Sequence, residues 1–136
     1  MNAQQPRRTR VEDYLWAVEE LSQGGRRATN GDIARRLGVA GGTASGMMRE
    51  LAAAGWVDLV PYAGVTLTEQ GRLQLRPIVR KRQLLEWFLQ HTLAISREEA
   101  SAESWRLEPS VSANLIQRIE AYREGGQGET KTATQS

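Results

Sequence analysis

The chain has 136 residues, of which 40% are hydrophobic and 25% charged, and it fits one domain or two very small ones. It contains no cysteine, which excludes disulfides and thiolate metal sites and favours a cytoplasmic location. The net charge of +2 is uneven: residues 1–95 carry +4 (13 Lys+Arg, 9 Asp+Glu) and residues 96–136 carry −2 (5 and 7), so the basic first part favours a polyanionic partner.

Residues 1–8 are polar and predict a disordered arm, not a signal peptide. Thr9 followed three residues later by Glu12 is a capping-box pattern, which predicts a helix to about Ser22. Its apolar residues recur at helical spacing and form one face: Val11, Tyr14, Leu15, Val18 and Leu21. Gly24 and Gly25 are expected to end the helix.

Two further helices follow in quick succession. Thr29 is the predicted N-cap of the second helix, with Asp32 in its first turn and Gly38 at its end. The link Val39–Gly42 leads into a third helix that ends at Gly55. The buried stripe of the third helix is predicted to consist of Ala44, Met47, Met48 and Leu51.

A small hairpin is predicted next. The segment 56–60 is rich in strand formers, 61–64 is a turn, and 65–68 is the returning strand. Thr68 then caps a long helix over about 69–91, which Pro77 should kink or divide.

Two shorter helices are expected after the long one. Ser96 and Glu99 form a second capping box, and the helix they begin must end near Leu107 because Pro109 disfavours helix at the residue before it. A last helix covers about 112–123. Residues 124–136 are nearly devoid of apolar side chains and predict a disordered tail. No apolar run approaches the ~20 residues of a membrane span, so we expect no membrane partner.

The order of three helices and a hairpin is typical of a winged helix-turn-helix, which places its third helix in the DNA major groove. We therefore predict a mostly helical chain with a small β-hairpin: a winged DNA-binding domain at 9–71 and a helical dimerisation domain at 72–123. Basic, hydroxyl and small residues are the candidates for contacts with double-stranded DNA. They are Arg10, Arg26, Arg27, Ala40, Gly42, Thr43, Ser45, Gly46, Arg49 and Tyr62.

The long helix carries an apolar segment that is a candidate interface for a second copy of the chain. Its candidate dimer residues are Leu84, Leu85, Trp87 and Phe88, some of which could instead fill the monomer core. Because a two-fold dimer reads two half-sites, a homodimer suits a DNA-binding repressor.

An enzyme finds no support in the sequence. The single histidine, His91, has no cysteine or second histidine as a partner. The stretch GVAGGTASG lacks the Gly-Lys-Ser/Thr ending of a phosphate-binding loop.

The sequence resembles the diphtheria toxin repressor and manganese transport regulator family, in its short manganese-type branch. The resemblance runs from Val11 to Tyr122 and is carried by EDYL, DIARRLGV, GWV, PYAGVTLTEQGR and RQLLEWFL. It implies a dimeric repressor in which a divalent metal binds between the DNA-binding and dimerisation regions. No further SH3-like domain is expected.

The same resemblance implies a degenerate metal site. Ligand positions are retained at Asp13, Glu86 and Glu108, whereas Trp16, Arg82, Trp105 and Pro109 occupy positions where the family has other ligands. We therefore expect no cofactor, although three carboxylates could still hold Mn²⁺ or Fe²⁺ weakly. One hypothesis is that Arg82 supplies a fixed positive charge in place of the metal.

Three alternatives remain open from the sequence. The chain could form mixed dimers with a metal-sensing relative, residual metal could still gate it, or a small organic effector could occupy a tryptophan-lined space.

Overall fold

The computed structural model describes residues 9–135, with side chains through Gly125. The predicted arm at 1–8 lies outside the described residues. The chain forms two compact units, Met1–Pro77 and Ile78–Ser136.

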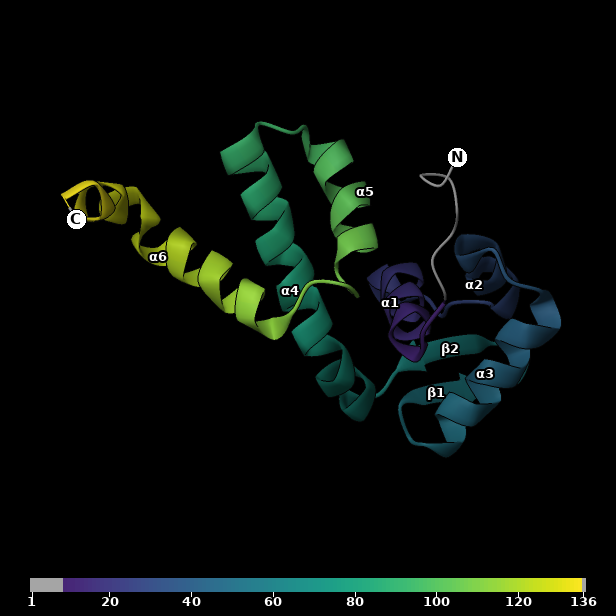
Figure 1. Cartoon of the computed structure of the whole chain (residues 1–136). Coiled ribbons are helices and arrows are strands. Elements are labelled where there is room, and N and C mark those ends of the chain that lie inside the picture. Colours follow the sequence, from purple (N-terminus) through teal and green to yellow (C-terminus); the bar gives the residue numbers. More distant parts are fainter. Residues whose placement is uncertain (1–8, 136) are drawn as a thin grey trace. The chain divides into compact units, whose positions relative to one another are not determined.

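The first unit is a winged helix-turn-helix, as predicted (Figure 1). Helices α1 (Val11–Leu21), α2 (Asn30–Leu37) and α3 (Gly41–Ala53) precede strands β1 (Val57–Val60) and β2 (Gly64–Leu67). A short 3₁₀ turn, η2 (Gln23–Gly25), follows α1. The strands are antiparallel, with Val57 opposite Leu67 and Val60 opposite Gly64.

The start of α1 differs from the prediction. Its N-cap is Arg10, not Thr9, and the carboxylate that reaches back is that of Asp13, not Glu12. Asp13 Oδ2 accepts the backbone N–H of Arg10 at 2.8 Å. The pattern was displaced by one residue because an acidic residue stands at both 12 and 13, and the aspartate has the geometry to close the box.

The second helix begins and ends as predicted. Thr29 Oγ1 accepts the backbone N–H of Asp32 at 3.0 Å, and Gly38 takes a left-handed φ of +69° at the C-terminus.

The core of the first unit is built from all these elements. Its fully buried large side chains are Leu15, Val18, Ile33, Met48 and Val65. Met47, predicted for the buried stripe, is only half-buried because it lies at the edge of the α3 face that carries Met48.

A backbone contact that was not predicted from the sequence extends the hairpin. Ala28 and Val65 exchange two backbone hydrogen bonds of 2.8 Å, so the chain before α2 lies along the free edge of β2. Gly64 accommodates this approach, with φ +113° and the Ala28 carbonyl oxygen 2.5 Å from where a Cβ would stand. A bridge made by one residue produces no alternation of polar and apolar side chains, so the Ala28–Val65 contact could not be predicted from the sequence.

Helix α4 (Glu69–Leu93) is capped by Thr68, as predicted, whose Oγ1 accepts the Gly71 N–H at 3.1 Å. The helix contains Pro77 without being divided into two. Pro77 has no backbone N–H, so the carbonyl of Leu73, four residues earlier, lacks its helical hydrogen-bond donor. Leu73 is exposed, so water can reach this carbonyl.

The boundary between the two units falls at Pro77, beyond the predicted 71/72. The first turns of α4 belong to the first unit because Leu75 is buried and Gly71 lies against the carbonyl of Trp56.

The second unit holds the rest of α4 with α5 (Arg97–Leu107) and α6 (Ala113–Gln135). Figure 1 shows α4 and α5 as an antiparallel pair joined by a short loop. Leu84, Leu85 and Ile119 form its buried core, and Phe88, Val111 and Ile116 pack against them. None of the helices in residues 9–135 is long and apolar enough to cross a membrane.

The caps of α5 and α6 are serines. Ser96 Oγ accepts the Glu99 N–H at 3.2 Å and Ser112 Oγ accepts the Leu115 N–H at 3.1 Å. We predicted that the last helix ends near Arg123 and gives way to a disordered tail, whereas helical backbone continues to Gln135. No proline follows Pro109, so the local hydrogen-bond pattern can propagate.

Candidate nucleic-acid interface and ligand positions

The solvent side of α3 carries most of the predicted DNA contacts. Thr43, Arg49, Gly42 and Ala40 are exposed, and Gly46 is half-buried. A Cβ at Gly42 would meet nothing within 4 Å. Internal packing therefore does not require a glycine there, and the start of α3 is left open to an approaching backbone.

Ser45 is less available than its neighbours on α3. It is half-buried, and its Oγ accepts a hydrogen bond from Asn30 Nδ2 at 3.1 Å. This bond ties α2 to α3 and orients the hydroxyl, so the O–H of Ser45 is the part that could reach DNA.

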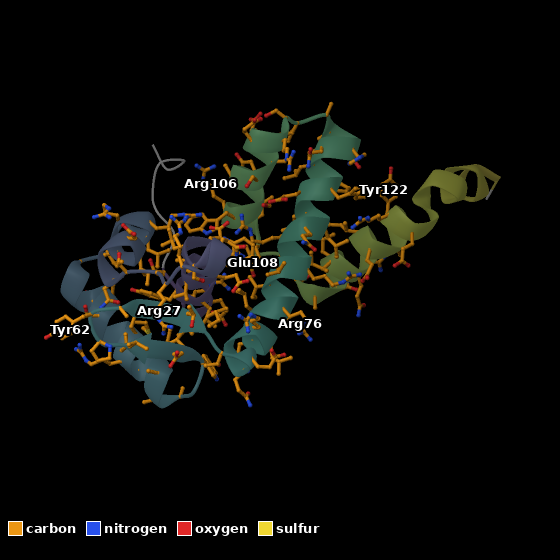
Figure 2. All side chains as sticks on the ribbon, turned by 180° about the vertical axis from the view of Figure 1, so that it is seen from behind. Arg27, Tyr62, Arg76, Arg106, Glu108 and Tyr122 are labelled. Carbon is orange, nitrogen blue, oxygen red and sulfur yellow. The ribbon has the colours of Figure 1, made fainter. Side chains whose placement is uncertain are left out.

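Tyr62 stands at the tip of the hairpin. Its side chain is fully exposed and projects away from the ribbon (Figure 2). Its φ of +64° is a left-handed conformation that a non-glycine residue adopts at a cost. The aromatic ring at the tip of the hairpin is therefore accessible, and its contact with DNA stays a prediction.

Arg27 is held within the fold. Its Nε donates to the Gly64 carbonyl at 3.2 Å, and its Nη2 donates to the Asp58 carbonyl at 2.7 Å and to Asp58 Oδ2 at 2.9 Å. This arginine therefore joins the loop before α2 to the hairpin, a structural role that the sequence did not reveal. Arg26 is exposed, whereas Arg10 lies 3.5 Å from Asp13 Oδ1.

Asp13, a ligand position implied by the family resemblance, lies in the first unit and is 4% exposed. Its Oδ2 accepts the Arg10 N–H at 2.8 Å and its Oδ1 lies 3.5 Å from the Arg10 guanidinium. Burial raises the pKa of the adjacent Tyr14 above its ordinary value, and the Asp13 carboxylate raises it further. Trp16 is half-buried. Asp13 thus already serves as a helix cap.

In the second unit, Glu108 is 2% exposed and follows the last turn of α5 (Figure 2). Its Oε2 lies 3.9 Å from Lys81 Nζ. Arg82, 7% exposed, places Nη2 4.0 Å from Glu86 Oε2, which also accepts the Ser104 hydroxyl at 3.2 Å. Two carboxylates and two cations therefore lie together between α4 and α5.

Sequence analysis missed Lys81 and Ser104 in this cluster. Trp105, at a substituted position, is half-buried, and Pro109 is exposed. Lys81 could have been found, because it shares α4 with Arg82 and a buried carboxylate needs a cation.

Each of the three carboxylates has a basic side chain beside it. In the first unit the carboxylate of Asp13 faces Arg10. In the second unit the carboxylate of Glu86 faces Arg82 and that of Glu108 faces Lys81. Within residues 9–135, no three His, Cys, Asp or Glu side chains form a group that could hold a metal ion.

The four predicted dimer residues differ in their surroundings. Leu84 and Leu85 are 1% and 3% exposed and belong to the core of the second unit, so we assign Leu84 to the fold. Leu85 and Phe88 line an apolar groove of about 510 Å³, together with Leu89, Leu107, Val111, Leu115, Arg118, Ile119 and Tyr122. Trp87 stacks on His91, with ring centroids 5.3 Å apart.

Known proteins match the chain over both units. The model described as "Iron dependent repressor, N-terminal DNA binding domain" matches residues 8–65, and "Iron dependent repressor, metal binding and dimerisation domain" matches 68–125. The transcriptional regulator MntR of Escherichia coli O157:H7 is 31% identical, covering 85% of this chain and 74% of its own.

Two further proteins are similar to the chain over most of its length. An HTH-type transcriptional regulator of Methanocaldococcus jannaschii is 28% identical over 84% of this chain and 92% of its own. The crystal structure of T. acidophilum IdeR superimposes with a TM-score of 0.78 at 25% identity over 88% of this chain. The present chain spans 55% of the length of that structure.

Proposed function

The chain belongs to the iron-dependent repressor family, a family of DNA-binding transcriptional regulators and not of enzymes, and from this premise we propose that it is a homodimeric repressor whose DNA binding no longer depends on manganese or iron. The proposal places it in the cytoplasm, with double-stranded DNA as its partner.

The observation that carries the DNA-binding part is the exposed side of α3. Thr43 and Arg49 face solvent there, and Tyr62 stands exposed on the hairpin of the same unit. A helix of this kind fits the major groove, where a hydroxyl and a guanidinium reach phosphates and base edges. Because this side offers few amide or guanidinium groups to bases, DNA shape is expected to contribute to specificity.

Arg49→Glu tests this surface. The substitution replaces a phosphate-seeking cation by an anion, so affinity for promoter DNA should fall at least tenfold, measured by fluorescence anisotropy. Arg97→Glu, at an equally exposed arginine at the start of α5, is the matched control and should bind like the native protein. Unchanged affinity of Arg49→Glu would mean that the surface is wrongly assigned.

Loss of metal gating is supported by the ionic pairs. A divalent ion would add two positive charges, and Lys81 and Arg82 already bring two positive charges to Glu108 and Glu86. Our prediction from the sequence gave this role to Arg82 alone; the geometry favours a pair of cations, with Lys81 as the neighbour of the buried Glu108.

Two alternatives remain distinguishable. A chain that acts by forming mixed dimers with a metal-sensing relative would bind promoter DNA weakly by itself. A chain gated by residual metal would bind DNA only when Mn²⁺ or Fe²⁺ is added. A titration onto promoter DNA with chelator and then with added metal separates both from the proposed function.

A further inference from the structure

A polar cavity of about 400 Å³ lies in the first unit, and its lining includes two of the candidate DNA contacts, Arg26 and Arg27. Four segments surround it: the end of α1, the loop that follows, the middle of β2 and the first turn of α4. The lining residues are Glu19, Ser22, Gln23, Gly24, Gly25, Arg26, Arg27, Thr66 and Arg72.

The alternation of β2 places this cavity on the outer face of the hairpin. Val65 and Leu67 are buried and face the core, so Thr66 between them points to the other face, as does Asp58 opposite it. Helix α3 buries Ala44 and Met48 in the core instead. No residue of α3 lines the cavity.

The lining of the cavity is rich in guanidinium groups. It holds three arginines, Arg26, Arg27 and Arg72, and one carboxylate, that of Glu19. The charge of Arg27 is balanced by Asp58, which together with Gly64 fixes this guanidinium in place, so Arg26 and Arg72 supply the positive charge that is free for a ligand. A fixed guanidinium loses little freedom when a ligand binds beside it.

The other two arginines are available to a ligand. Arg72 Nη1 lies 3.9 Å from Glu69 Oε1, and with side chains 51% and 75% exposed this pair contributes little. Arg26 makes no hydrogen bond or ion pair with any residue in the described part of the chain and is exposed. Both side chains can turn into the cavity without breaking a strong interaction.

From this arrangement we infer that the cavity is a binding site for a small organic oxyanion, a metabolite that carries phosphate or carboxylate groups. Its volume falls within the range of small-molecule sites, about 300–1,000 Å³. Guanidinium groups bind phosphate and carboxylate through paired hydrogen bonds. A ligand here would connect the loop after α1 to the first turn of α4.

Isothermal titration calorimetry of the full chain, without DNA, tests the site. Inorganic pyrophosphate and citrate serve as separate probes, at an ionic strength held constant with sodium chloride. We expect one site per chain for at least one probe, and the tighter probe identifies the oxyanion chemistry. Arg26→Gln/Arg72→Gln should weaken that binding at least tenfold, because charge-assisted hydrogen bonds are lost. Arg35→Gln/Arg49→Gln, two exposed arginines outside the cavity, should not.

Two results would overturn the inference. One is that neither probe binds with a stoichiometry near one per chain. The other is that both double variants weaken binding equally, which would indicate general attraction to a basic surface. The calorimetry contains no DNA, so its outcome is independent of the proposed regulatory function.

Discussion

The role of the Glu108 carboxylate depends on the side chains that surround it. The family resemblance places a metal ligand there, yet the carboxylate is 2% exposed with Lys81 Nζ 3.9 Å away. A buried carboxylate needs a compensating charge, and removing one partner of such a pair costs more than replacing both. In the neighbouring pair the buried member is the cation: Arg82 is 7% exposed, and the half-buried Glu86 carboxylate beside it also accepts the Ser104 hydroxyl.

Lys81→Met should therefore lower the free energy of unfolding by about 3 kcal/mol. This value is the lower end of the range for broken buried ion pairs, because the Lys81 side chain is 21% exposed. Urea unfolding followed by circular dichroism measures the loss. The double variant Lys81→Met/Glu108→Gln, which removes both charges, should recover much of the stability. A single variant as stable as the native protein would show that Lys81 does not compensate Glu108.

At the scale of elements, the ends of most helices follow from side chains that cap them. Thr29, Thr68 and Ser96 could be identified from the sequence because a hydroxyl or carboxylate pattern marks each start. The start of α1 was misplaced by one residue because Glu12 and Asp13 both satisfy the pattern, and only the backbone geometry selects between them. The end of α6 was missed because composition says little about continuation of a local hydrogen-bond ladder.

The site was predictable to a similar extent. Exposed positions on α3 follow from helical periodicity, so Thr43 and Arg49 were found. The tie from Arg27 to Asp58 joins residues far apart in sequence and carries no local signal. The neighbour relation between Lys81 and Glu108 likewise depends on how α4 meets α5, which periodicity does not determine.

Two helical glycines with opposite surroundings test the packing of α4 in the first unit. A Cβ at Gly71 would overlap the Trp56 carbonyl oxygen, so Gly71→Ala should destabilise the protein by about 1–3 kcal/mol. Gly42→Ala meets nothing within 4 Å and should be neutral or stabilising by up to about 1 kcal/mol. Thermal unfolding of both variants gives the comparison. Equal melting temperatures would contradict the close approach of α4 to Trp56.

At the scale of the whole molecule, repression requires two copies in register with two half-sites. The apolar groove of the second unit offers the surface: Leu107, Leu115 and Tyr122 are 37–48% exposed along it. Exposed apolar side chains gathered in one groove are typical of an interface. This is why we propose that a second copy of the chain covers the groove.

Leu115→Glu places a charge in that groove and should convert the dimer to monomer, read by analytical ultracentrifugation. Leu93→Glu is the matched control, since Leu93 is 55% exposed at the end of α4 and does not line the groove. If Leu115→Glu remains dimeric, or if both variants dissociate equally, another surface holds the two copies together.

We propose that DNA binding by this chain does not depend on manganese or iron. A titration of the purified protein onto fragments of its own promoter region, first with chelator and then with Mn²⁺ or Fe²⁺, tests this proposal. Tight binding of equal affinity in both conditions is the predicted result, since Lys81 and Arg82 supply the charge beside Glu108 and Glu86. Binding that develops only after metal is added would contradict the account, because Asp13, Glu86 and Glu108 would then still serve a working metal site.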